Sequence, residues 1–348
     1  MEYIIIPICF IISILITPLI KKLAFRINAV DLPNERKVHQ KVMPRIGGLA
    51  IYISFIIGLF LYNPDSSVLW PLFIGGTIIM IVGLIDDVFQ ISPLQKFIGQ
   101  LLAVLTVMLS GIQIDFITIP FGARIELGLW GIPLTILWVL FVTNAINFID
   151  GLDGLASGVS AIALTTISVM AITMGNMFIA IIGFMLLGSI LGFLVYNFYP
   201  AKIFLGDTGS NFLGFMISIL AILGLFKNVT VFSIIIPIVI LGVPFVDTLF
   251  AVIRRITKRK PIYAPDKLHL HHCLLKLGYS HRQTVLLLYG MSAVFSLAAI
   301  IFTRTTLWGS VVLFVLLATL IELIVEITGL ISQNYRPILN LINRRKNY

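Results

Sequence analysis

The chain has 348 residues, of which 59% are hydrophobic and only 11% are charged, and its formal net charge is +9 at pH 7. Soluble domains carry about 25% charged residues, so the composition excludes an ordinary soluble fold. Apolar runs of about 20 residues recur along the chain, each long enough to cross a hydrocarbon layer roughly 30 Å thick. These features predict an all-α, polytopic helical membrane protein rather than a transmembrane barrel, whose strands are short alternating segments.

The first apolar run has no basic segment before it and ends at Lys21 and Lys22, so we expect a retained span and not a cleaved signal peptide. Similar runs follow at short intervals and predict about eleven transmembrane helices, with ten as the alternative. The expected spans are 3–21, 46–62, 69–85, 97–115, 129–145, 156–174, 177–196, 210–226, 230–250, 284–303 and 307–330. We expect residues 1–348 to form a single integral membrane domain.

Basic residues indicate the orientation of these spans. Of the 24 Lys and Arg residues, all but Arg124, Lys227 and Arg304 fall on the side that the chain reaches after its first span. The positive-inside rule makes that side cytoplasmic. The net charge is therefore a topology signal, and no nucleic-acid partner is expected. The expected cytoplasmic loops are 22–45, 86–96, 146–155, 197–209 and 251–283.

One stretch on the outer side, IDFITIPFGARIELG (residues 114–128), alternates apolar and polar residues around Phe121 and Gly122. Such alternation, interrupted by a glycine, predicts a short β-hairpin. No separate soluble domain is evident from the sequence.

Acidic, amide and histidine side chains gather in four stretches, and two predicted spans separate each stretch from the next. An even number of crossings returns the chain to the same side, so all four lie at cytoplasmic helix ends. Helix ends commonly carry Asp and Asn as caps, but four such sets on one face favour a shared active site. They are GLIDDVFQISPLQK with Asp86, Asp87 and Lys96, NAINFIDGLDGLA with Asn144, Asn147, Asp150 and Asp153, FLGDTGSNFLGF with Asp207, and PDKLHLHHCLLKLGYSHR with His269, His271 and His272.

Carboxylates beside glycines, without cysteine ligands, suit a hard cation such as Mg²⁺. The GDTGS turn around Asp207 leads directly into a span, so free helix N–H groups there can face an anion. Asp150 and Asp153 are spaced i, i+3, which in a helical segment places both on one face. Asp86 and Asp87 are adjacent and point about 100° apart on a helix, so we expect them to do different jobs.

The histidines, together with Lys267, Arg254 and Arg255, suit the binding of a diphosphate. A zinc site made by the three histidines and Cys273 is the alternative, although the spacing does not match a common zinc pattern. A loop that only anchors the protein at the interface is a second alternative. The basic first loop, DLPNERKVHQKVMPRIGG, is expected to attract an anionic lipid head group.

Taken in order, these stretches resemble the polyprenyl-phosphate N-acetylhexosamine-1-phosphate transferases, and most of all the bacterial undecaprenyl-phosphate N-acetylglucosamine-1-phosphate transferases. The resemblance is carried by DLPNERKVHQKVMPRIGGLAIY, DDVFQISPLQK, NFIDGLDGLASG, FLGDTGSNFLGF and PDKLHLHHCLLKLGYSHRQ. It implies that UDP-GlcNAc and undecaprenyl phosphate react to give undecaprenyl-diphospho-GlcNAc and UMP, the first membrane step of teichoic acid or other cell-surface glycan synthesis. It places the active site on the cytoplasmic face of the bacterial cytoplasmic membrane, and it leaves a homodimer open.

The resemblance also implies a Mg²⁺ cofactor, with Mn²⁺ as a substitute, and a role for each matching residue. The implied catalytic residues are Asp86, Asp87, Asp207 and Lys96, of which the first two position or deprotonate the lipid phosphate. The implied metal ligands are Asp207, Asp150 and Asp153. The implied substrate-binding residues are Asn144, Asn147, Asp150, Asp153, His269, His271, His272, Arg254 and Arg255. Direct attack by the lipid phosphate is favoured over a covalent carboxylate intermediate.

Three alternatives remain at this point. A relative that transfers phospho-MurNAc-pentapeptide, or another N-acetylhexosamine phosphate, would share the aspartate stretches. An ion-coupled transporter would place its ionisable residues near the bilayer midplane, whereas these lie at one end of the spans. A structural scaffold would not need four convergent polar sets.

Overall fold

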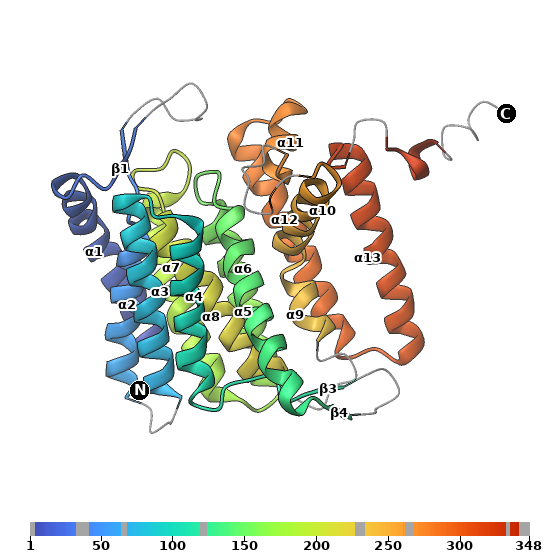
Figure 1. Ribbon diagram of the computed structural model, residues 1–348, viewed down its shortest axis with the longest axis horizontal. Helices are drawn as coiled ribbons and strands as arrows, with labels where there is room; N and C mark the ends of the chain where they lie inside the picture. Colours follow the sequence, from blue (N-terminus) through green and yellow to red (C-terminus); the bar gives the residue numbers. More distant parts are fainter. Residues whose placement is uncertain are drawn as a thin grey trace.

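The computed structural model describes residues 4–32, 42–63, 68–118, 124–226, 234–259, 261, 268–331 and 335–340. The described chain is a bundle of helices that run up and down side by side (Figure 1). Among these residues, eight helices are long and apolar enough to cross a membrane. The predicted all-α, polytopic architecture is therefore confirmed.

Ten of the predicted spans each correspond to one helix. They are α1 (Ile5–Arg26), α2 (Gly48–Tyr62), α3 (Leu69–Phe89), α4 (Pro93–Met108), α5 (Gly131–Phe148), α6 (Leu155–Thr173), α7 (Met177–Asn197), α8 (Gly206–Ala221), α12 (His281–Phe302) and α13 (Leu307–Thr328). A 3-10 turn, η2 (Gly128–Trp130), precedes α5, and a π-helical turn, η3 (Ile222–Phe226), extends α8. The helices α2 and α4 have only 15 and 16 residues, and α8 has 16 before its π-helical extension.

The ninth predicted span, 230–250, is wrong as a single helix. Its described part is divided into α9 (Ile235–Ile240) and α10 (Gly242–Thr257), with the break at Leu241. Pro244 has no N–H to donate to the carbonyl four residues earlier, and its ring would clash with that carbonyl, but it is tolerated in the first turn of a new helix. A short helix, α11 (Leu270–Lys276), then precedes α12.

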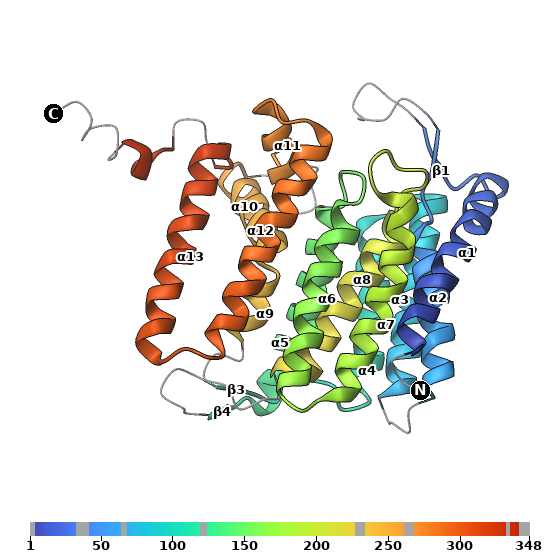
Figure 2. The same cartoon turned by 180° about the vertical axis from the view of Figure 1, so that it is seen from behind.

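The helix α8 lies at the centre of the bundle and packs against α2, α3, α5 and α6. All the residues of its apolar stretch are buried (100%), whereas only 17% of those in the apolar stretch of α13 are buried. Seen from behind, α13 stands at one edge, next to α12, and the α1–α3 group forms the opposite edge (Figure 2). The polar first turn of α8 is therefore enclosed by protein and not by lipid.

Two small antiparallel ribbons decorate the bundle. The predicted hairpin is confirmed as β3 (Phe116–Thr118) paired with β4 (Arg124–Glu126), and its tip at Phe121 and Gly122 lies outside the described residues. A second ribbon, β1 (Val30–Asp31) with β2 (Met43–Pro44), was not predicted. It closes the first loop and brings the chain to Arg45. The basic residues Arg36, Lys37 and Lys41 of that loop lie outside the described part.

Glycines let the start of α8 approach its neighbours at backbone distance. A Cβ atom on Gly48 of α2 would overlap the backbone of Gly209, and one on Gly83 of α3 would overlap the Asp207 carbonyl. Interiors as closely packed as this cannot absorb an added methyl without movement of the backbone. These two glycines therefore fix where the GDTGS turn sits.

We expect Gly48→Ala to destabilise the protein, because the added methyl pushes α2 and α8 apart, at a cost of about 1–3 kcal/mol. The midpoint of thermal unfolding in detergent measures this. Gly290→Ala in α12 is the matched control, because nothing lies near its added Cβ. Removing a helical glycine in open space should leave the midpoint unchanged or raise it. Equal midpoints for the two variants would contradict the packing argument.

Candidate active site

Asp87, near the end of α3, caps the first turn of α8 from outside that helix. Its carboxylate accepts hydrogen bonds from the backbone N–H of Asp207 (3.0 Å) and from both the N–H (2.9 Å) and the hydroxyl (2.6 Å) of Thr208. Arg45 completes the set with an ion pair to Asp87 Oδ1 at 2.9 Å. The Asp87 side chain is fully buried, so its charge is compensated within the protein.

Asp86 points away from Asp87, as expected for adjacent helical residues, and joins a second cluster. Its Oδ2 lies 3.0 Å from Lys96 Nζ, which is also 2.8 Å from Asp207 Oδ2. The other oxygen of Asp207 accepts a 2.6 Å hydrogen bond from the amide of Asn147, which also donates to Ser210. Residues from α3, α4, α5 and α8 therefore meet around one ammonium group.

Local structure explains why Lys96 reaches this position. Ser92 caps α4 in a capping box with Gln95, so Lys96 lies within the first turn of the helix. The predicted start of this span at residue 97 had placed Lys96 before the helix. The turn from α3 to α4 is held by Asp86 Oδ1, which accepts from the N–H of Ile91 at 3.1 Å. The same aspartate thus shapes the turn and receives the ammonium group that follows it.

An amide network lies one helical turn deeper. Gln100 and Asn144 exchange hydrogen bonds of 3.0 and 3.4 Å, and Gln100 also donates to Asn211 at 3.1 Å. Asn211 in turn donates to the carbonyl of Asp207 at 2.8 Å. Asn144 is therefore part of the scaffold beneath the carboxylates, together with Gln100 and Asn211, which the sequence had not singled out.

The segment with Asp150 and Asp153 is a turn, because α5 ends at Phe148 and α6 begins at Leu155. The expectation that the two aspartates share a helical face is therefore wrong. Within the described part of the chain, the Asp150 side chain has no hydrogen-bond donor. Burial, followed by the nearby Asp207 and Asp87 carboxylates, raises its pKa well above the usual range.

Asp153 is turned toward the rest of the loop region. Its Oδ2 accepts from the N–H of Ala201 at 2.9 Å, and its own N–H donates to His281 Nε2 at 3.0 Å. The hydroxyl of Tyr289 donates to the carbonyl of Gly154 beside it. These contacts anchor the turn to the segment between α7 and α8 and to α12, so they support a positioning role for Asp153 more directly than a metal-ligand role.

The histidine loop is organised by Asp247, a buried acid in α10 that the sequence reading missed. Its two oxygens contact His269 Nδ1 at 2.8 Å and the N–H of Leu270 at 2.6 Å, which caps α11. A signal existed, because an acid within the apolar stretch VPFVDTLF is costly unless it has partners. The stretch was interpreted only as a membrane span.

His271 connects this loop to the aspartates. Its ring lies against Gly151, where a Cβ atom would overlap Nε2, and that nitrogen is buried without a hydrogen bond to any described residue. Burial lowers the pKa of His271 to about 3, so its ring is neutral at pH 7. The His269 and His271 rings are parallel, with centroids 5.9 Å apart, and His271 and His272 are 4.2 Å apart.

The two arginines of α10 diverge. The Arg255 guanidinium lies over the Phe148 ring at 5.4 Å, and Phe148 in turn contacts His269, so Arg255 faces the end of α5. Arg254 donates to the carbonyl of Leu330 at 2.8 Å, beyond the end of α13. That hydrogen bond gives Arg254 a part in joining α10 to α13, which the predicted diphosphate role did not include.

Lys267, which the sequence analysis grouped with the histidines, lies outside the described residues. Cys273 donates to the carbonyl of Leu268 at 3.7 Å. Among the described residues, no group of three or more His, Cys, Asp or Glu side chains could hold a metal ion. The zinc alternative therefore receives no support from this loop.

The oxygen donors at the start of α8 are nevertheless of the kind that Mg²⁺ selects, since it takes one or two carboxylates and fills the rest of its shell with water and substrate phosphates. The surroundings of Asp150 test whether these residues fit a Mg²⁺ ion. A partly buried carboxyl near two other carboxylates is stabilised in its charged form by a cation. Asp207 and Asp150 therefore fit a Mg²⁺ site completed by substrate, and Asp86 borders it through Lys96.

A membrane bundle that gathers carboxylates, an ammonium group and amides at one end of its helices defines a class of protein, the integral membrane enzymes that act on phosphate groups. Comparison with known proteins specifies the class further. The sequence model of the family described as glycosyl transferase family 4 matches residues 69–225. This segment runs from α3 to α8 and contains Asp87 and the whole Lys96 cluster, whereas Arg45 precedes it.

Individual relatives match almost the whole chain. A probable undecaprenyl-phosphate N-acetylglucosaminyl 1-phosphate transferase of Bacillus subtilis is 47% identical over 97% of this chain and 96% of its own. A decaprenyl-phosphate N-acetylglucosaminephosphotransferase of Mycobacterium leprae is 35% identical over 97% and 90%. An undecaprenyl-phosphate alpha-N-acetylglucosaminyl 1-phosphate transferase of Haemophilus influenzae is 34% identical over 79% of each chain.

The chain therefore belongs to the polyprenyl-phosphate N-acetylhexosamine-1-phosphate transferase family, as the sequence motifs indicated. Members of this family are phosphotransferases that use a polyprenyl phosphate as the acceptor. Family membership removes the transporter and scaffold alternatives.

We expect Asp87→Asn to unfold at a lower temperature than the native protein. The amide cannot accept hydrogen bonds at both positions, so a buried N–H of the α8 cap loses its partner, and the partly exposed Arg45 loses its ion pair; the lost cap costs about 1–3 kcal/mol. Glu126→Gln is the control, since Glu126 pairs with Arg124 on an exposed outer surface. Thermal unfolding in detergent compares them. An Asp87→Asn midpoint equal to that of Glu126→Gln would show that the α8 cap contributes little.

Proposed function

We propose that the protein transfers GlcNAc-1-phosphate from UDP-GlcNAc to undecaprenyl phosphate, and releases UMP. The names of the three relatives share N-acetylglucosamine as the transferred sugar, although their lipid carriers differ between undecaprenyl and decaprenyl phosphate. The relative with 47% identity is named for undecaprenyl phosphate, which favours that carrier. The reaction would be a first membrane step of teichoic acid or other cell-surface glycan synthesis.

The observation that carries this proposal is the position of Lys96. Its ammonium group lies between the Asp86 and Asp207 carboxylates at the polar ends of four spanning helices. A lipid phosphate at the membrane surface can approach such a group without leaving the bilayer. The ammonium charge then offsets the charge of two phosphate groups brought close together.

We assign complementary jobs to the carboxylates. Asp86, whose oxygen contacts the same ammonium group, orients Lys96 and is placed to accept a proton from a lipid phosphate. Asp87 acts through α8, because its oxygens are used by Arg45 and the first turn of that helix. An oxygen of the lipid phosphate attacks the β-phosphorus of UDP-GlcNAc. The bond between this β-phosphorus and the oxygen that bridges it to the α-phosphate breaks, and UMP leaves with the electron pair.

We propose Mg²⁺, or Mn²⁺ in its place, as the cofactor, held by Asp207 and Asp150. Bound at these residues, the ion would supply positive charge to the diphosphate of the nucleotide sugar. Asn147 orients Asp207 for this purpose through its 2.6 Å hydrogen bond. Asp153 holds the turn that carries Asp150.

The histidine loop is proposed to bind the diphosphate from the other side of the turn. His271 presents a neutral ring with an unpaired buried nitrogen next to Gly151, and His269 is held in orientation by Asp247. Arg255 contributes its charge behind Phe148. The bias of basic residues toward this end of the bundle supports a cytoplasmic active site in the bacterial cytoplasmic membrane, where UDP-sugars are available.

Purified protein given UDP-GlcNAc, undecaprenyl phosphate and Mg²⁺ is expected to release UMP and form undecaprenyl-diphospho-GlcNAc, both measured by mass spectrometry. UDP-GalNAc and UDP-MurNAc-pentapeptide should give little product in the same assay. If either competitor were the better donor, the sugar assignment would be replaced by that competitor. If no donor released UMP from verified lipid, the proposed reaction would be wrong.

Chelation of divalent cations with EDTA is expected to stop turnover, and added Mg²⁺ should restore it. Asp207→Asn should lower kcat at least about a hundredfold, because it removes charge where phosphate charge must be balanced. Asp115→Asn, in the outer loop before the hairpin, is the matched control and should keep its activity. An unaffected rate in EDTA would refute the metal. A folded Asp207→Asn protein with normal turnover would remove Asp207 from the site.

A further inference from the structure

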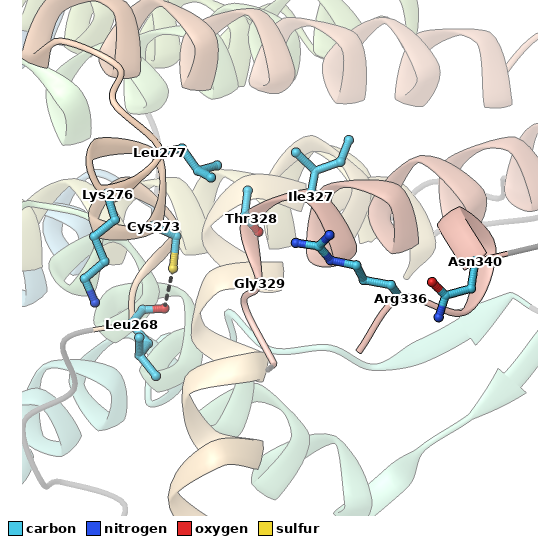
Figure 3. A pocket seen from close by; sticks show the side chains of 9 residues that line it. All are labelled: Leu268, Cys273, Lys276, Leu277, Ile327, Thr328, Gly329, Arg336 and Asn340. Atoms are coloured by element: carbon cyan, nitrogen blue, oxygen red, sulfur yellow. Dashed lines mark hydrogen bonds between the residues drawn. The ribbon is translucent and has the colours of Figure 1, made fainter. Parts of the chain in front are cut away.

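A polar cavity lies behind the histidine loop, on the side away from the aspartates. It encloses about 620 Å³ between α11 and the end of α13 (Figure 3). Lys276 at the end of α11 and Leu277 directly after it line one wall, and Ile327 and Arg336 line the other. None of the residues lining it is acidic, so the described cavity combines two cations with apolar side chains.

The wall that carries Arg336 is held in place by a buried carboxylate. Glu326 in α13 is 1% exposed, and its two oxygens accept hydrogen bonds from the N–H groups of Ile338 (2.6 Å) and Leu339 (2.8 Å). This pair of bonds fixes the segment 335–340 against the end of α13. Arg336 therefore has a defined location across the cavity from α11.

The membrane position of the cavity indicates where its occupant comes from. It lies at the end of α13, which stands at the edge of the bundle. Most residues in the apolar stretch of α13 are not buried by the rest of the protein. Leu277 and Ile327 are 49% and 55% exposed, so they offer apolar surface beside the two cations. Cations flanked by apolar side chains at a helix end match the head group and first chain atoms of an anionic lipid.

We propose that this cavity binds the phosphate of an anionic glycerophospholipid, with Lys276 and Arg336 as the anion-binding groups. Neither cation forms an ion pair with a described residue, and both are exposed toward the cavity side. The site is separate from the Lys96 cluster and does not depend on the transferase reaction proposed above.

The helix α11 connects the cavity to the histidine loop. On a helix, residues two apart point in nearly opposite directions, so His271 and Cys273 face opposite sides. His271 lies against Gly151 near the aspartates, and Cys273 lines the cavity. A bound lipid therefore contacts the reverse side of the helix that carries the histidines.

Native mass spectrometry of the full chain in detergent tests the proposal directly. Titration with dioleoyl phosphatidylglycerol is expected to give a retained adduct, and dioleoyl phosphatidylcholine a much weaker one. The double variant Lys276→Gln, Arg336→Gln should weaken phosphatidylglycerol binding roughly tenfold or more. Lys22→Gln with Arg26→Gln, which removes the same charges from exposed positions on α1, should bind as the native protein does.

Further experiments distinguish binding inside the cavity from binding to surface charge in general. They also distinguish a lipid ligand from inorganic phosphate. Leu277→Trp keeps both cations but fills the cavity, and it should also weaken binding. Inorganic phosphate at millimolar concentration should not displace the lipid.

Equal binding of the two lipids, or native binding by the double variant, would overturn the anion site. Native binding by Leu277→Trp would place the lipid elsewhere on the surface. Displacement by inorganic phosphate would show that a soluble anion occupies the cavity and would overturn the choice of a lipid. Any of these results leaves the transferase assay unaffected, so the two proposals can fail separately.

Discussion

The capping of α8 by Asp87 is the interaction on which the rest of the site depends. The first N–H groups of a helix have no partner within that helix, and in a buried position each unpaired group costs free energy. Because α8 begins inside the bundle, water is not available to it in the way it is at a surface. Asp87 satisfies these N–H groups from α3, and Arg45 compensates its charge. The cap therefore sets the location of Asp207 relative to α3 and α4.

That location explains why two adjacent aspartates are needed. A single carboxylate cannot both fill the first turn of α8 and contact an ammonium group on the opposite side of α3. Asp86 and Asp87 divide the work, since their side chains leave the helix about 100° apart. One fixes the helix that carries Asp207, and the other meets Lys96 beside Asp207. The pair thus couples the architecture of the bundle to the chemistry at its end.

Much of this was predictable from the sequence, because membrane helices are limited by simple physics. The lengths of the apolar runs predicted ten of the helices. The even number of crossings between polar stretches predicted that these stretches lie at one end of the bundle, and the alternation of apolar and polar residues predicted the β3–β4 hairpin. The sequence did not indicate which polar side chains contact one another. Which carboxylate caps α8, which acid holds His269, and which amides support Asn144 depend on contacts between distant segments. Asp247 was overlooked because its partner lies 22 residues away in the next loop.

Local breaks in helices were the other source of error. The i, i+3 spacing of Asp150 and Asp153 suggested a helix, but a glycine directly follows each aspartate and favours a turn, and Gly154 adopts a left-handed φ of 75° there. Pro244 divided the ninth span for a comparable reason. In both places an irregular backbone stands where polar groups must be presented, and a continuous helix would have buried them in lipid.

The turn at 149–154 is where the two halves of the site meet. On one side Asp150 faces the carboxylates at the start of α8, and on the other Gly151 receives the His271 ring. Any side chain larger than hydrogen at residue 151 would separate the histidine loop from the aspartates. The conformation of this one turn therefore decides whether the histidine loop and the carboxylates at the start of α8 lie next to each other.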